Sequence, residues 1–210
     1  MQNFIFRRVD PEETALMEQI YRLRFQVYGR ECGFINEEQY PDGLEIDEYD
    51  KQSLHFAAID SEGDVVGTTR LILTDHRLSP LEKYCPHVPV NRNVQPGRYA
   101  EISRLAISKN LRKKASLRLS FRSRSRKKKI KPGFLEHDFI AAGLYKELYK
   151  ESKLRCITHW VALMEKGLWF LLKIYGYKFE CLGEEVDVFG PVRPYIGKVS
   201  DIERCKLFKK

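Results

Sequence analysis

Apolar residues recur every three or four positions near the start of the chain, at Leu16, Ile20, Leu23 and Val27. This spacing places them on one face of an amphipathic helix. We therefore predict a helix from residue 11 to about residue 30, with Asp10 as its N-cap. The turn signal Pro41-Asp42-Gly43 marks residues 32–50, which follow the helix, as a loop.

Apolar runs further along the chain predict a sheet. Residues 54–59 and 65–74 read as two strands of a hairpin, joined by the polar turn Asp60-Ser61-Glu62-Gly63. The later elements predicted in chain order are a strand over 98–107, a helix over 135–149, a strand over 155–162, a helix over 163–175 closed by a left-handed Gly176, and strands over 177–181 and 186–189. This order predicts an α/β sandwich with a mixed sheet.

Length and composition favour a single globular domain over residues 1–210. The chain is 43% apolar and 31% charged, which is typical of soluble proteins with a proper core. We expect no signal peptide and no membrane span, because no apolar run approaches the roughly 20 residues that a span needs. The five cysteines are scattered without a CxxC pair, so we predict a cytoplasmic protein with reduced core thiols and no metal site.

The basic residues are concentrated in one segment. Residues 109–131 hold 12 Lys and Arg and no acidic residue, whereas 25 basic residues face 29 acidic ones elsewhere. We predict a mobile basic insert at about 109–132, because it is low in complexity and repels itself. It would dock an acidic carrier protein, bind nucleic acid, or be a solvated loop without a partner. Nucleic acid is poorly supported, since Phe121 is the segment's only aromatic residue.

Charged residues in apolar surroundings indicate a site. Arg24 lies beside the apolar helix stripe, Arg70 lies inside an apolar strand, and Asp47 and Asp50 lie in the loop between them. Because buried charges are costly unless paired, we predict that the two arginines tether the loop through these two carboxylates. Direct catalysis by the arginines is an alternative. A metal site made with Glu45 is another, although the spacing of a calcium loop is absent.

In the strand predicted over 98–107, two candidate site residues, Glu101 and Arg104, should face opposite sides of the sheet. In a regular strand Glu101 and Ser103 face one side and Arg104 faces the other. If Glu101 and Arg104 reach one site, a bulge must lie near them, and it would free an N–H for an oxyanion. Alternatively, Arg104 crosses the sheet to a helix carboxylate. Glu101 is the candidate general base, since its apolar neighbours imply burial and a raised pKa. Its alternative is a structural ion pair with an arginine.

Four blocks that carry these residues resemble the acyl-homoserine-lactone (autoinducer) synthases: 21–28, 45–50, 67–71 and 101–104. Further blocks resemble a sister group more closely, namely the PEP-CTERM/exosortase system-associated acyltransferases and long-chain N-acyl amino acid synthases. These blocks are 31–34, 40–43, 53–56, 157–160, 164–165 and 191–195. The resemblance covers nearly the whole chain apart from the basic insert.

The resemblance implies a bacterial acyltransferase with a GNAT-like (acyl-CoA N-acyltransferase) fold, in which helices flank a mixed, splayed central sheet. The splay would admit the phosphopantetheine arm of an acyl-carrier protein, and no cofactor would stay bound. Residues 110–114 contain no glycine where relatives that use coenzyme A have a phosphate-cradling turn, which favours a carrier-protein donor. The predicted docking residues for the carrier are Arg112, Lys113 and Lys114.

The resemblance also assigns roles to single residues. It implies a charged network at the acceptor end, made of Arg24, Asp47, Asp50, Arg70 and Arg104, with Ser103 beside it and Glu101 as the base. Tyr28 and Phe34 would shape the acceptor pocket, where the homoserine-lactone synthases favour Phe and Trp. An amino acid such as tyrosine is therefore a better expected acceptor than S-adenosylmethionine. We predict an N-acyltransferase that moves a fatty acyl group to an amino acid; an acyl-homoserine-lactone synthase is the nearest alternative.

Overall fold

The computed structural model describes residues 3–74, 78–90, 94–95, 97–109, 136–188 and 190–205. The predicted insert lies outside these residues except for Lys109, and so do Arg112, Lys113 and Lys114. The strands are β1 (Ile5–Val9), β2 (Ser53–Ile59), β3 (Val65–Leu73), β4 (Tyr99–Ile107), β5 (His159–Met164), β6 (Phe179–Cys181), β7 (Val186–Asp187) and β8 (Pro191–Lys198). The α-helices are α1 (Thr14–Phe25), α2 (Pro80–Tyr84), α4 (Glu136–Leu154) and α5 (Lys166–Tyr175).

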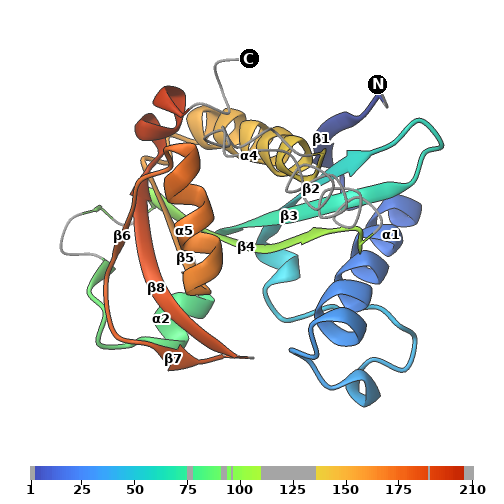
Figure 1. Cartoon of the computed structure of the whole chain (residues 1–210), viewed down its shortest axis with the longest axis horizontal. Coiled ribbons are helices and arrows are strands. Elements are labelled where there is room, and N and C mark those ends of the chain that lie inside the picture. The colour runs from blue at the N-terminus through green and yellow to red at the C-terminus, as the bar shows by residue number, and fades with distance from the viewer. Residues whose placement is uncertain are drawn as a thin grey trace, which may run out of the picture.

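The described strands form one mixed sheet in the order β1-β2-β3-β4-β5-β8-β6, with β7 paired to β8. Only the β4–β5 pair is parallel among these neighbours. The pairing between these two strands extends only from Tyr99, opposite His159, to Glu101, opposite Val161, although both strands continue beyond that point. The two strands therefore part after Glu101, as Figure 1 shows. The prediction of a splayed sheet is confirmed.

Helices cover both faces of the sheet. Ile140 and Leu144 of α4 pack against Phe56 of β2 on one face, while Ile20 of α1 packs against the next strand residue, Ala57, on the other. Alternate strand residues face opposite sides, which is why one apolar strand supplies both cores. The α4 face is tightly packed, since a Cβ placed on Gly67 of β3 would lie 2.5 Å from Ile140 Cγ2.

Several predicted boundaries are wrong. The first helix begins after Glu13 rather than Asp10, and it passes into a π-helix over Gln26–Glu31. The strand predicted at 155–162 lies at His159–Met164, because α4 continues to Leu154. The left-handed Gly176 that closes α5 is confirmed, with φ 93°. Among the described strands and α-helices, β1, α2 and β8 were not predicted.

The five cysteines are free, but only Cys85 and Cys205 are buried. The prediction of core thiols is wrong for Cys32, Cys156 and Cys181, which lie at the ends of elements or on a short outer strand where side chains reach solvent. Among the described residues, no helix combines the length and apolar character needed to cross a bilayer.

Candidate active site

The predicted bulge lies in β4, and Arg104 occupies it. The β3–β4 register shifts between Thr68 and Arg70, so that Thr69 faces two residues of β4. Arg104 has a φ of 54°, in the left-handed region that few residues other than glycine adopt. Two hydroxyl groups bind carbonyl oxygens there: Thr69 Oγ1 donates to Ser103 O at 3.1 Å and Tyr28 Oη donates to Leu105 O at 2.9 Å. The bulge brings Arg104 to the same cavity as Glu101.

Three arginines and three carboxylates form a closed ring of ion pairs, in the order Arg24, Glu45, Arg104, Asp47, Arg70, Asp50 and back to Arg24. We call this set the arginine–carboxylate ring. Each arginine contacts two carboxylates and each carboxylate contacts two arginines. The distances other than that of the Arg24–Glu45 pair lie between 2.6 and 2.9 Å. Its members come from α1, β3, β4 and the loop before β2, so the ring ties that loop to the sheet.

The ring has balanced charge, and only one edge of it is accessible. Arg24, Glu45 and Arg70 are at most 1% exposed, whereas the side chains of Arg104 and Asp47 are 19% and 18% exposed. Nearby arginines hold the pKa of the Glu45, Asp47 and Asp50 carboxyls below the usual range, against the opposing effect of burial. The carboxylates are therefore ionised and already occupied, which leaves none of them free to bind a metal ion.

The ring confirms the predicted tether, since Arg24 pairs with Asp50 and Arg70 pairs with both Asp47 and Asp50. It also contains Glu45, which we considered only as a metal ligand and which binds Arg24 and Arg104. Arg104 pairs with loop carboxylates and not with a helix carboxylate. Nothing in the local sequence distinguishes buried Glu45 from exposed Glu48, because only the folded loop sets their directions.

Tyr28 and Phe34 lie beside the accessible edge of the ring. The Arg104 guanidinium carbon lies 5.6 Å from the centre of the Tyr28 ring, close enough for a cation–π contact. The Tyr28 and Phe34 ring centres are 6.3 Å apart, and both side chains line the cavity. Burial raises the pKa of Tyr28 to about 12, so its hydroxyl stays protonated as the donor to Leu105 O.

Glu101 lies where β4 and β5 part and is only 1% exposed. Burial raises the pKa of Glu101 to about 7, although hydrogen bonds from the Leu81 amide and the Ser79 hydroxyl and the charge of Arg70 act in the opposite direction. Leu81 N donates to Glu101 Oε2 at 2.8 Å. None of the ion pairs between described residues involves Glu101, so the structural ion pair is not formed. This carboxyl group exchanges a proton near neutral pH.

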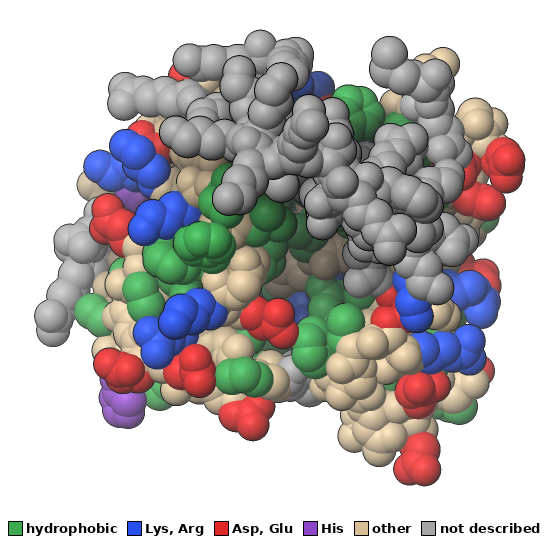
Figure 2. Space-filling view, in the orientation of Figure 1, with side chains coloured by type: hydrophobic (Ala, Val, Ile, Leu, Met, Phe, Trp, Pro, Cys, Tyr) green, Lys and Arg blue, Asp and Glu red, His purple; other side chains and the backbone are tan. Residues whose placement is uncertain are grey.

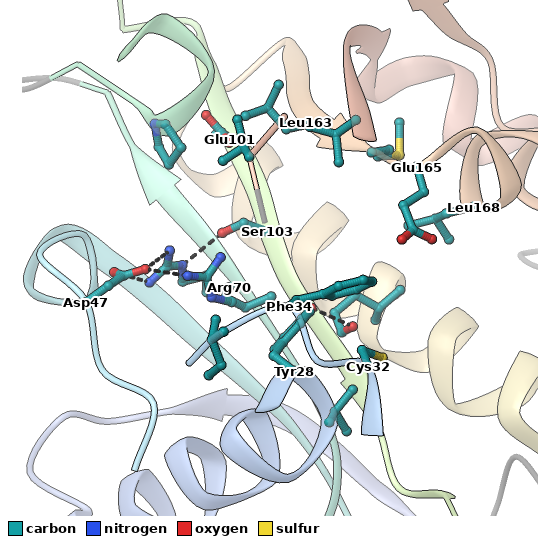
Figure 3. A pocket seen from close by; sticks show the side chains of 18 of the residues that line it. Tyr28, Cys32, Phe34, Asp47, Arg70, Glu101, Ser103, Leu163, Glu165 and Leu168 are labelled. Atoms are coloured by element: carbon teal, nitrogen blue, oxygen red, sulfur yellow. Dashed lines mark hydrogen bonds and ion pairs between the residues drawn. The ribbon is translucent and has the colours of Figure 1, made fainter. Parts of the chain in front are cut away.

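One cavity of about 620 Å³ joins these groups. Its polar end holds Asp47, Arg70, Glu101, Ser103 and Arg104. Ser103 Oγ accepts from Arg70 Nε at 2.8 Å. Figure 3 shows Asp47 and Arg70 on one side and Glu165 and Leu168 on the other. Figure 2 shows this face of the molecule hollowed near its centre.

The other end of the cavity is apolar. It is formed by residues of the parting strands and of the two helices beside them, among them Leu105, Ile107, Ala141, Tyr145, Leu168 and Leu171. The cavity thus has a charged end with a proton-accepting carboxyl group and an apolar end between α4 and α5. That combination suits a substrate with a reactive head and a long hydrocarbon tail.

Comparison with known proteins agrees with this geometry. A sequence model described as an acetyltransferase (GNAT) domain matches residues 23–122. No curated protein sequence matches the chain significantly. The fold is GNAT-like, and the domain match supports an acyltransferase as the class of enzyme.

Three solved structures illustrate the similarity of fold. The AHL synthase LasI is 18% identical with a TM-score of 0.66, over 95% of this chain and 91% of LasI. The CoA-dependent acyl-homoserine lactone synthase BjaI, solved with SAM and isopentyl-CoA, is 19% identical with a TM-score of 0.69, over 96% and 87%. FeeM, an N-acyl amino acid synthase from uncultured soil microbes, is 14% identical with a TM-score of 0.64, over 100% and 98%.

Proposed function

We propose that this protein transfers a fatty acyl group from an acyl-carrier protein to the amine of an amino acid. The observation that carries the proposal is the buried carboxyl group of Glu101, placed where two strands part in a cavity with an apolar end. A general base works best when its pKa is near the working pH, and the pKa of Glu101 is about 7.

The reaction follows from this arrangement. The amino acid arrives as an ammonium, which has no lone pair for attack, so Glu101 takes one proton from it directly or through a water. The amine nitrogen then bonds to the thioester carbon, and a backbone N–H near the bulge stabilises the oxyanion. As the C–S bond breaks, the nitrogen gives its second proton to the departing sulfur, so that the thiol of the phosphopantetheine leaves and an N-acyl amino acid remains.

The accessible edge of the ring favours an acceptor that carries a carboxylate. Arg104 Nε and Nη2 bind Glu45 and Asp47, whereas no hydrogen bond between described residues uses its Nη1. An incoming carboxylate would bind this nitrogen with a charge-assisted hydrogen bond. Tyr28 and Phe34 would contact the rest of the acceptor, and Ser103 would lie between it and Arg70.

The apolar end supports a long acyl chain. Leu105 and Ile107 of β4 and Ala141 of α4 would contact the tail, so that burial of its methylene groups contributes roughly 0.8 kcal/mol for each one. The carrier would approach through Arg112, Lys113 and Lys114, which lie outside the described residues. The PEP-CTERM/exosortase context and the cytoplasmic location stay predictions.

The proposal is tested by incubating the protein with palmitoyl-carrier protein or palmitoyl-CoA and single amino acids, and by measuring products by mass spectrometry. We expect N-palmitoyl amino acids with the carrier protein, loss of product with Glu101→Gln, and normal turnover with Glu62→Gln, a matched change on the exposed β2–β3 hairpin. Unchanged turnover in Glu101→Gln would exclude Glu101 as the base. Equal turnover with palmitoyl-CoA would exclude carrier specificity.

The alternative function is an acyl-homoserine-lactone synthase. The observation that favours it is the shared fold with BjaI, whose structure contains SAM. An added assay with S-adenosylmethionine as acceptor distinguishes the two, because this alternative releases methylthioadenosine and a lactone. Nucleic-acid binding rests on the basic segment outside the described residues, and we do not propose it.

A further inference from the structure

The short helix α2 contacts Glu101 through its first turn. Leu81 N donates to Glu101 Oε2 at 2.8 Å, and Ser79, the N-cap of the helix, lies two residues before Leu81 in the same turn. Ser79 and Leu81 are fully buried. The first turn of the helix therefore holds the carboxylate through a buried backbone donor.

Glu82 fixes this first turn. Its Oε2 accepts from Ser79 N at 2.9 Å, and its own N–H donates to Ser79 Oγ at 3.4 Å, which together make a capping box. Tyr99 Oη donates to Glu82 Oε1 at 2.5 Å, and Tyr99 lies on β4 two residues before Glu101. Glu82 thus ties α2 to the strand that carries the proposed base.

We propose that Ser79 and Glu82 are positioning residues, through which the capped first turn of α2 orients the Glu101 carboxylate. The inference rests on the proposed function, in which Glu101 is the base. The two residues have opposite effects on the ionisation of Glu101. Ser79 favours the ionised form, whereas the negative charge of Glu82 disfavours it.

Other groups also face Glu101, and the test must leave them unchanged. The titratable and charged groups are Arg70 of β3, Tyr49 of the loop before β2, Tyr99 of β4, and Glu82 and Cys85 in and after α2. Ser79→Ala removes the hydroxyl that the Glu82 N–H binds, and Glu82→Gln removes one negative charge, while Arg70, Tyr49, Tyr99 and Cys85 are left unchanged. Gln is also accepted at this position of a capping box, so Glu82→Gln should retain the helix.

The experiment follows the titration of Glu101 by carbon-13 NMR of glutamate-labelled protein, without any substrate. The signal that disappears in Glu101→Gln identifies the residue. We expect its midpoint near pH 7 in the wild type, about one pH unit higher in Ser79→Ala, and lower in Glu82→Gln. Ser61→Ala and Glu62→Gln, on the exposed hairpin, should titrate as the wild type does.

Each outcome decides the inference. Midpoints that match the wild type in both variants, or that move in the same direction, would overturn it. Ser79→Thr keeps a hydroxyl and should restore the wild-type midpoint, and Glu82→Gln alone still decides the result if Ser79→Ala fails to fold. Because the titration needs no turnover, it is independent of the assay for N-acyl products. Activity of Glu101→Gln would refute the proposal that Glu101 is the base, whereas unchanged titration midpoints in the α2 variants would refute only the proposed role of α2.

Discussion

Replacing Glu45 by glutamine would leave the arginine–carboxylate ring with three arginines and two carboxylates. Glu45 is completely buried and contacts both Arg24 and Arg104. Glutamine has nearly the same shape, so the variant changes the charge and little else. Each arginine would keep one carboxylate partner or more, but the buried ring would carry one uncompensated positive charge.

The expected cost follows from measurements on buried pairs. Removing one partner of a buried ion pair costs about 3–5 kcal/mol, a large part of the roughly 5–15 kcal/mol that stabilises a typical domain. At about 2–4 °C for each kcal/mol in a chain of this size, the melting temperature should fall by about 6–20 °C. Removing Arg24 together with Glu45 leaves two arginines and two carboxylates. The double variant Arg24→Gln, Glu45→Gln should therefore lose less stability than the sum of the single variants.

Urea unfolding at pH 7 measures these free energies, with Glu48→Gln as the matched control. Glu48 pairs with Lys83 on the surface, and both side chains are about half exposed or more, so this control should change stability little. Equal midpoints for Glu45→Gln and Glu48→Gln would refute the reasoning. Strict additivity in the double variant would show that the ring is not a coupled unit.

Three further predictions concern the base, the cavity and the packing of α4. Glu101 has a pKa of about 7 in the folded protein, above its ordinary value of 4.5, so the wild type loses stability as the pH rises between these values. Glu101→Gln has no such group, and its free energy of unfolding should rise by up to roughly 3 kcal/mol relative to that of the wild type between pH 4 and pH 8. An equal difference in stability between Glu101→Gln and the wild type at pH 4 and at pH 8 would contradict this. Ala141→Leu should shorten the preferred acyl chain in a competition between chain lengths and leave the acceptor KM unchanged; an unchanged product distribution would place the tail elsewhere. Gly67→Val should destabilise the protein by about 1–3 kcal/mol in urea, because its side chain would overlap Ile140. Gly167→Val is the control without overpacking, because Gly167, like Gly67, has no positive φ and no atom lies within 4 Å of a Cβ there.

The bulge shows what sequence reasoning can provide. Glu101 and Arg104 are three residues apart in an apolar strand, and alternation forbids them to share a face. Requiring both at one site predicted the irregularity that the register shift and the φ of Arg104 confirm. The argument needed no knowledge of the neighbouring strands, because it rests on the period of a single strand.

The missed elements had weaker local signals. β1 begins with an exposed isoleucine and contains two consecutive arginines, so it shows no clear alternation. β8 contains Pro191 and Pro194, and proline normally argues against a strand. α2 is too short for a helical period, but Ser79 followed by Pro80 and Glu82 is the pattern of a capping box and could have located it. The partners of Glu45 are Arg24, which lies 21 positions before it, and Arg104, which lies 59 positions after it. No local sequence pattern reveals pairs so far apart.

The closed ring also limits how this sequence can change over generations. Any single substitution that removes a charge leaves an odd number of charged members, and the structure then holds an unmatched ion. A tolerated path removes an arginine and an adjoining carboxylate together, such as Arg24 with Glu45 or Arg70 with Asp50. Among homologous sequences we therefore expect the six positions to be retained as a set or lost in neighbouring pairs of opposite sign, which makes pairwise covariation a signature of this ring.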